Sequence, residues 1–143
     1  MFLVNDCDQW CPLAWGSNKT RRVVKSTPAA ETLALVDARQ VCFCLGHILS
    51  EILFRNVHKI PIECYVDNHS VWDNVHCTKN VTEKRLRIDL VCIKEMLVKQ
   101  ELSSVKWVDS SNQLSHCFTK RCVNTGKLLE VLRNGCLAIQ GNK

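Results

Sequence analysis

The sequence lacks the features of a secreted or membrane-spanning protein. Its first eight residues contain neither a basic segment nor an apolar run long enough for a signal peptide. No apolar run approaches the roughly 20 residues that a transmembrane helix needs. We therefore expect an intracellular protein, cytoplasmic or nuclear, that is not secreted and does not bind a membrane.

The ten cysteines are not spaced like a zinc site, because no C-x-x-C pair occurs among them. Cys42 and Cys44 stand two apart in a helical pattern, so they cannot share a face of that helix. Without a secretory route the thiols are expected to stay reduced. Cys42, Cys64 and Cys92 are interpreted as small apolar core residues.

The sequence also has no internal repeat and no low-complexity linker. A chain of 143 residues, 46% of them hydrophobic, is long enough for one compact domain and short for two, so we expect a single domain over residues 1–143. The net charge is +5, with the Lys and Arg residues in clusters. Such clustering favours an anionic partner.

The longest helical pattern is predicted to begin at Thr27 as the N-cap, with Pro28 in the first helical position, and to end near Phe54. Its apolar residues recur three and four apart, which is typical of a helix packed on a sheet. This predicted buried stripe comprises Ala30, Leu33, Ala34, Val41, Leu45, Ile48, Leu49 and Ile52.

The other segments predict an α/β fold in which helices flank a sheet. Residues 2–15 are typical of a β-hairpin, and residues 60–66 and 105–108 are predicted strands. Helical patterns cover residues 70–76, 83–99, 113–120 and 124–137.

Two carboxylates are candidate site residues. Glu31 lies one turn into the long helix, and Asp67 directly follows the strand at residues 60–66, where sites form in α/β sheets. Each also has a structural interpretation: Glu31 complements the helix dipole, and Asp67 forms a turn.

Basic residues are candidates for phosphate contact. Arg21 and Arg22 lie in a polar connection, and Lys84 and Arg87 lie near the start of the predicted helix at residues 83–99. These side chains either contact the backbone of a nucleic acid or form a solvated surface, and the sequence favours neither.

Five motifs follow one another along the chain. They are P-L-A-W-G-S-N-K within residues 11–19, S-T-P-A-A-E-T-L-A-L at 26–35, Y-V-D-N-H-S at 65–70, K-R-L-R-I-D-L at 84–90 and Q-L-S-H-C-F-T-K at 113–120. In order and spacing they resemble the ribonuclease H domain at the carboxyl end of copia-type retrotransposon Pol polyproteins. The resemblance covers nearly the whole chain and implies a ribonuclease H-like fold with a mixed sheet.

The resemblance implies cleavage of the RNA strand of RNA–DNA hybrids by two Mg²⁺ ions held by four carboxylates. Glu31 would be the helix carboxylate and Asp67 the strand-end carboxylate. The last aspartate of the family aligns with His116, and an imidazole is a poor replacement for a carboxylate at a magnesium site. The first aspartate has no match in this chain, and the spacing of Asp6, Asp8 and Asp109 does not support a replacement.

We therefore expect an N-terminally truncated, catalytically inactive copy whose first strand is missing. It would retain weak binding of RNA–DNA hybrid or another nucleic acid through Arg21, Arg22, Lys84 and Arg87. Two alternatives remain open. One is an active nuclease that receives its missing aspartate from an upstream segment or a partner chain. The other is a protein-interaction or scaffold domain without a nucleic-acid role.

Overall fold

The computed structural model describes residues 1–18, 20, 22–55, 60–77, 81, 83–119 and 124–136. The chain divides into two compact units, one formed by Met1–Lys19 with Val108–Lys143 and the other by Thr20–Trp107. Helices and strands occur in both units, so the α/β class expected from the sequence is confirmed.

The first unit contains a hairpin and two short helices. Strands β1 (Phe2–Val4) and β2 (Trp10–Pro12) pair antiparallel, with Phe2 opposite Pro12, which confirms the predicted hairpin. The Phe2 and Trp10 rings pack edge to face with centroids 5.7 Å apart. Helices α4 (His116–Thr119) and α5 (Gly126–Asn134) are shorter than predicted, and the ends predicted at residues 120 and 137 lie outside the described residues.

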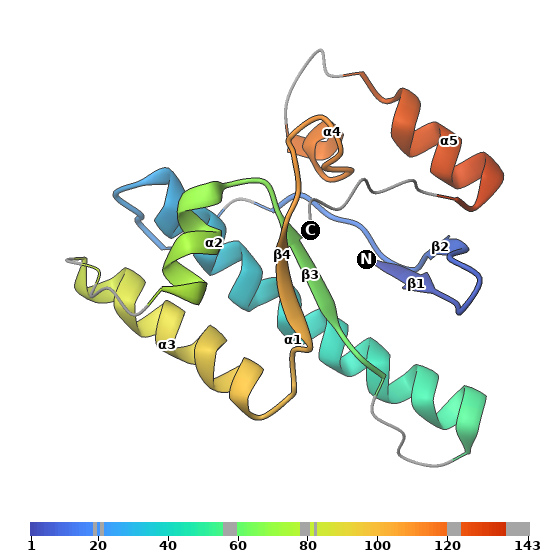
Figure 1. The fold of residues 1–143 in the computed structure, drawn as a ribbon, viewed down its shortest axis with the longest axis horizontal. Coiled ribbons are helices and arrows are strands. Elements are labelled where there is room, and N and C mark those ends of the chain that lie inside the picture. Colours follow the sequence, from blue (N-terminus) through green and yellow to red (C-terminus); the bar gives the residue numbers. More distant parts are fainter. Residues whose placement is uncertain are drawn as a thin grey trace. The chain divides into compact units, whose positions relative to one another are not determined.

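The second unit holds the longer elements in the order α1 (Thr27–Phe54), β3 (Glu63–Val66), α2 (His69–His76), α3 (Lys84–Val98) and β4 (Ser104–Trp107) (Figure 1). β3 and β4 pair in parallel, with Val66 opposite Trp107. In the described part of the chain the strands therefore form two two-stranded sheets, one antiparallel and one parallel.

Helix α1 begins one residue earlier than predicted. Ser26, with extended backbone angles, is the N-cap, and its hydroxyl accepts a hydrogen bond from the Ala29 amide at 3.3 Å. Thr27 is therefore the first helical residue and Pro28 the second, where a missing N–H costs nothing. The prediction of Thr27 as the cap was wrong because serine and threonine are both good caps.

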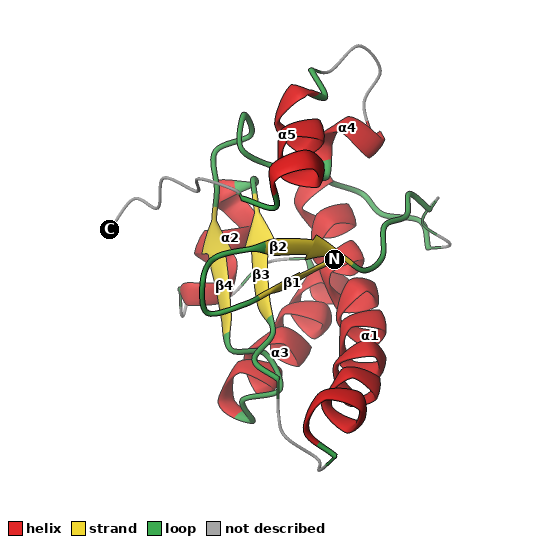
Figure 2. Ribbon diagram, turned by 90° about the vertical axis from the view of Figure 1, so that its right-hand side faces the viewer, coloured by secondary structure: helices red, strands yellow, loops and turns green. Residues whose placement is uncertain are grey.

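The core of the second unit lies on one face of the β3–β4 pair, where α1, α2 and α3 pack (Figure 2). Alternation along the strands directs Val66 and Val105 into this core. Glu63 and Lys106, on the opposite face, form an ion pair at 2.7 Å. Further core residues come from the helices and from the connection after α3: Ala29, Val75, Leu86, Leu90, Ile93, Met96 and Leu102.

The predicted buried stripe of α1 was largely wrong. Of its eight members only Leu33 is fully buried, whereas Ala34, Val41, Ile48 and Ile52 are exposed. The fully buried positions of α1 are instead Ala29, Thr32, Leu33 and Ser50. Periodicity located the helix, but its apolar residues lie on more than one face, so the pattern did not identify the covered one.

Helix α1 is also the one described helix long and apolar enough to cross a membrane, by length and composition alone. The helix passes on its mean hydropathy and contains no uninterrupted apolar run of about 20 residues, so the expectation about apolar runs stands. Only 11% of its most apolar window is buried in the structure. The same test is passed by core helices of soluble proteins and by signal sequences, so it is weak support for a membrane span.

Candidate functional site

Asp67 is held in a tight connection between a strand and a helix. It directly follows β3, and the next residue, Asn68, is the N-cap of α2, its side chain accepting from the Ser70 amide at 2.9 Å. The indole N–H of Trp107, at the end of β4, donates to the Asp67 carbonyl at 3.3 Å. Both neighbours fix the backbone of Asp67 at the carboxyl ends of the two parallel strands.

Glu31 lies in the second turn of α1 and is half-buried. Two residues before it, Ala29 is part of the core cluster that also contains Val66, the residue preceding Asp67. The core therefore anchors the backbone beside both carboxylates in one unit. α1 and α2 also contact one another.

Two histidines and two tryptophans of α2 and β4 lie in a chain of ring contacts after Asp67, and the sequence interpretation did not single them out. His69 Nδ1 lies 2.9 Å from the Asp73 carboxylate, and its ring centroid lies 5.5 Å from Trp72 and 5.8 Å from Trp107. The Trp72 and His76 rings lie 4.7 Å apart. The spacing of His69 and Asp73, four apart in a helical pattern, was the signal that could have predicted their pairing.

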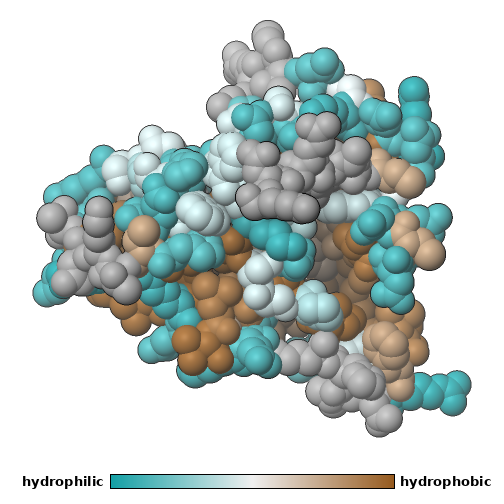
Figure 3. Space-filling view, viewed as in Figure 1, coloured by the Kyte–Doolittle hydropathy of each residue, from teal (hydrophilic) through white to brown (hydrophobic). Residues whose placement is uncertain are grey.

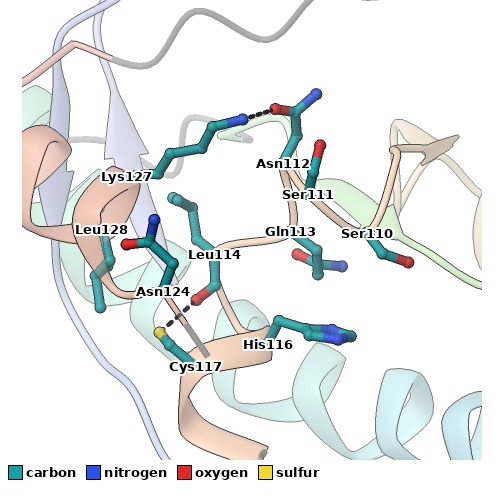
Figure 4. Close-up of a pocket in the computed structure, with 10 residues that line it drawn as sticks. All are labelled: Ser110, Ser111, Asn112, Gln113, Leu114, His116, Cys117, Asn124, Lys127 and Leu128. Carbon is teal, nitrogen blue, oxygen red and sulfur yellow. Dashed lines mark hydrogen bonds between the residues drawn. The ribbon is translucent and has the colours of Figure 1, made fainter. Parts of the chain in front are cut away.

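His116 lies in the first unit, at the start of α4, and lines a pocket of about 270 Å³ (Figure 4). Lys127 Nζ donates to the Asn112 side-chain oxygen across this pocket, and Cys117 Sγ lies 3.0 Å from the Leu114 carbonyl. Among the described residues that line it, none is Asp or Glu: Ser110, Ser111, Asn112, Gln113, Leu114, His116, Cys117, Asn124, Lys127 and Leu128. The pocket thus offers an imidazole and a thiol but no carboxylate to a metal ion.

Asp109, just before that pocket, has a local structural role. Its carboxylate accepts from the Ser111 amide at 2.9 Å, and the hydrogen bonds from Ser111 lower its pKa below the ordinary value. This is the turn chemistry typical of Asp in loops.

The donor set around Glu31 and Asp67 fits magnesium chemically, because both ligands are hard carboxylate oxygens. In the part of the chain that the structure describes, no group of three or more His, Cys, Asp and Glu residues is arranged to hold a metal ion. Mg²⁺ is commonly bound through one or two carboxylates together with substrate phosphates. Glu31 and Asp67 are thus two of the four carboxylates that the resemblance implies for a pair of ions.

The basic candidates gather at the start of α3. Arg22 donates to both carboxylate oxygens of Asp89 at 3.0 Å, while Lys84 and Arg87 are exposed. Arg85, also exposed, adds a third cation to the first turn of α3, whose N-cap residue is the acidic Glu83 and makes no side-chain capping hydrogen bond. Arg21 lies outside the described residues.

Cations at a helix N-terminus oppose the helix dipole, so this basic turn does not stabilise α3 through its charges. The same arrangement adds the positive end of the dipole to three side-chain charges and attracts anions. Lys84, Arg85 and Arg87 thus place three positive charges at the start of α3, beside the acidic N-cap Glu83.

Comparisons with protein-family models, curated proteins and solved structures give no match for this chain.

Proposed function

We propose that this chain is a retrotransposon-derived, ribonuclease H-like domain that binds RNA–DNA hybrids but does not cleave them by itself. The observation that carries the proposal is the common anchoring of its two motif carboxylates. Glu31 on α1 and Asp67 at the end of β3 each lie within two residues of a member of one core cluster, Ala29 and Val66. Sites in such sheets form at the carboxyl ends of parallel strands, where Asp67 lies, and magnesium prefers carboxylate oxygens as ligands.

Glu31 and Asp67 are the residues that would hold a magnesium ion in this domain. An ion held there would supply positive charge to a nucleic-acid phosphate. Cleavage by the two-ion route needs a second ion about 4 Å away with its own ligands. The fourth position of the motif set is His116, in a pocket without carboxylates, and this supports binding without cleavage.

Phosphate contact is assigned to the basic start of α3. Lys84 and Arg87 are exposed in a turn whose dipole also favours anions. The Arg22–Asp89 pair leaves the Arg22 side chain half exposed, at 51%, so it can contribute positive charge next to α3 while neutralising Asp89.

The test is binding of a fluorescently labelled RNA–DNA hybrid duplex to the full chain at several salt concentrations. Replacing Lys84 and Arg87 with Ala should weaken binding and reduce the slope of log K against log salt by about 2, since each lost phosphate contact removes about 0.9. Lys99→Ala, at the opposite end of the same helix, is the matched control and should leave the slope unchanged. Equal effects of both changes, or no binding at low salt, would refute the proposal.

The metal assignment has a separate test. Mn²⁺ should bind the folded chain with an affinity that falls at least about tenfold in Asp67→Asn, because one of two carboxylate ligands is lost. Glu51→Gln, an exposed carboxylate near the far end of α1, should not change it. An affinity that responds equally to both changes would show that the ion binds surface charge only.

A protein-interaction domain without nucleic-acid binding is the second candidate. It is favoured by the exposed aliphatic side chains on the second half of α1, which nucleic-acid binding does not explain.

A further inference from the structure

The outer face of α1 carries a row of apolar residues that we call the α1 seam: Val41, Leu45, Ile48 and Ile52. Val41 is 52% exposed, Ile48 51% and Ile52 69%, while Leu45 is half-buried. Their spacing of four, three and four is the alternation of a coiled-coil interface. Ala34 and Ala38, both exposed, continue the same spacing toward the start of the helix.

The α1 seam lies opposite the side by which the helix packs in its own unit. Thr32 and Ser50, at 0% and 1% exposure, are 18 residues apart, which is five full turns, so they share one covered face. Ile48 and Ile52 lie two residues on either side of Ser50 and therefore project from the far side. A helix that buries a serine while exposing isoleucines has a second apolar face without a partner in the described structure.

The exposed apolar area is large for a single helix. The α1 seam with the two preceding alanines exposes roughly 400 Å² of apolar surface, near the size of the largest patch on a typical monomer. Hydrophobic surface is visible over the last turns of α1, at the lower right of the space-filling view (Figure 3). Leu53 and Phe54 add exposed apolar side chains there.

We propose that the α1 seam binds the α1 seam of a second copy of this chain, forming a two-helix, coiled-coil-like homodimer. Knobs-into-holes packing requires a partner helix with the same spacing, and a second copy supplies it through a two-fold axis. With flanking side chains, two seams bury on the order of 1,000 Å² in total, which reaches the lower limit of a specific interface.

The charges beside the α1 seam are compatible with this pairing. Asp37 and Glu51 are exposed along one edge, and the other edge carries the uncharged residues Leu35, Cys42 and Leu49. In a parallel dimer each acidic edge faces the uncharged edge of the partner helix, so no like charges meet. The occupant that the seam fits is therefore another α1 in parallel orientation.

The experiment is sedimentation equilibrium of the full chain under reducing conditions, from low to high micromolar concentration. The wild type should form dimers, and the double change Ile48→Glu and Ile52→Glu should raise the dissociation constant at least about a hundredfold. The matched control is Ile88→Glu with Val91→Glu, the same chemical change at exposed positions of α3, and it should leave the dimer intact.

Three results would overturn the proposal. They are a wild type that is monomeric at every concentration, a dimer that survives the two α1 changes, and a monomer that binds phospholipid vesicles through α1. Circular dichroism must show that the variants keep their helix. If the glutamate variant unfolds, Ile48→Ser with Ile52→Ser replaces it and should weaken the dimer in the same direction. Dimer formation is measured in the absence of nucleic acid, so a chain that stays monomeric would not contradict the hybrid-binding proposal.

Discussion

The two halves of α1 belong to one continuous helix, yet they have different surroundings. In the first half Ser26 caps the helix, and Ala29, Thr32 and Leu33 are buried. Near the middle, Arg39 forms an ion pair with Glu101 in the connection after α3. In the second half Ser50 is the one fully buried residue, while Val41, Ile48 and Ile52 are exposed. The same apolar pattern thus serves a core in one half and an outer surface in the other.

This contrast predicts a large difference in stability between two changes of the same kind. Leu33→Ala, at 5% exposure, should lower the free energy of unfolding by about 2–5 kcal/mol, because it leaves a cavity. Ile52→Ala, at 69% exposure, should change it by no more than about 0.5 kcal/mol. Urea denaturation at low protein concentration measures both, and similar losses would show that the outer face of α1 is covered in solution.

Thiol reactivity tests which faces are covered within the second half of α1. Cys44 is exposed, whereas Cys42, two residues away, is half-buried and burial raises its pKa. At mildly alkaline pH iodoacetamide should modify Cys44 at least about tenfold faster than Cys42, since the thiolate is the reactive form. Burial raises the pKa of Cys64 on β3 to about 12, so Cys64 should be slower still. Mass spectrometry of the modified peptides gives the rates, and equal rates at Cys42 and Cys44 would contradict the assigned faces.

The N-cap of α1 is expected to contribute about 1 kcal/mol to the stability of the protein. Ser26→Ala removes the acceptor of the Ala29 amide and should cost about 1 kcal/mol of stability, the usual loss of an N-cap. Thr27→Ala is the neighbouring control and should cost less, because Thr27 is the first helical residue rather than the cap. If Thr27→Ala were the more damaging change, the helix would begin where the sequence predicted.

The smallest change in stability is expected for the Glu63–Lys106 ion pair on the exposed face of the β3–β4 pair. The hydrogen bond from Lys106 lowers the pKa of Glu63 below its ordinary value. A lowered folded pKa contributes stability above the unfolded pKa, and that contribution is lost as the pH falls through the folded pKa. Lys106→Met should therefore flatten the acid side of the stability curve slightly, by less than an exposed ion pair is usually worth, about 1 kcal/mol. If Lys106→Met left the stability at acidic pH unchanged, the Glu63–Lys106 ion pair would contribute nothing to stability.

The sequence predicted the elements well where local signals decide. The hairpin, both strands of the parallel pair, α2 and α3 lie within three residues of their predicted limits. Asp67 stands at the strand end where it was expected. These features depend on alternation, helix periodicity and turn chemistry, all of which are local.

Other features depend on partners distant in the sequence. Which face of α1 is buried depends on α2 and α3, so the stripe through Val41, Ile48 and Ile52 could not be assigned from periodicity alone. The Arg22–Asp89 pair joins residues 67 apart, and the Trp107–Asp67 hydrogen bond joins residues 40 apart. No local pattern contains such contacts, and they are what give the candidate site its surroundings.

The most direct test of hybrid binding without cleavage is one titration of the full chain with an end-labelled RNA–DNA hybrid in Mg²⁺ across a range of salt. This titration measures both the affinity for the hybrid and the integrity of its RNA strand. We predict that log K falls steeply and linearly with log salt while the RNA strand stays intact. Binding that is absent or insensitive to salt would contradict it, and so would RNA cleavage that Glu31→Gln abolishes.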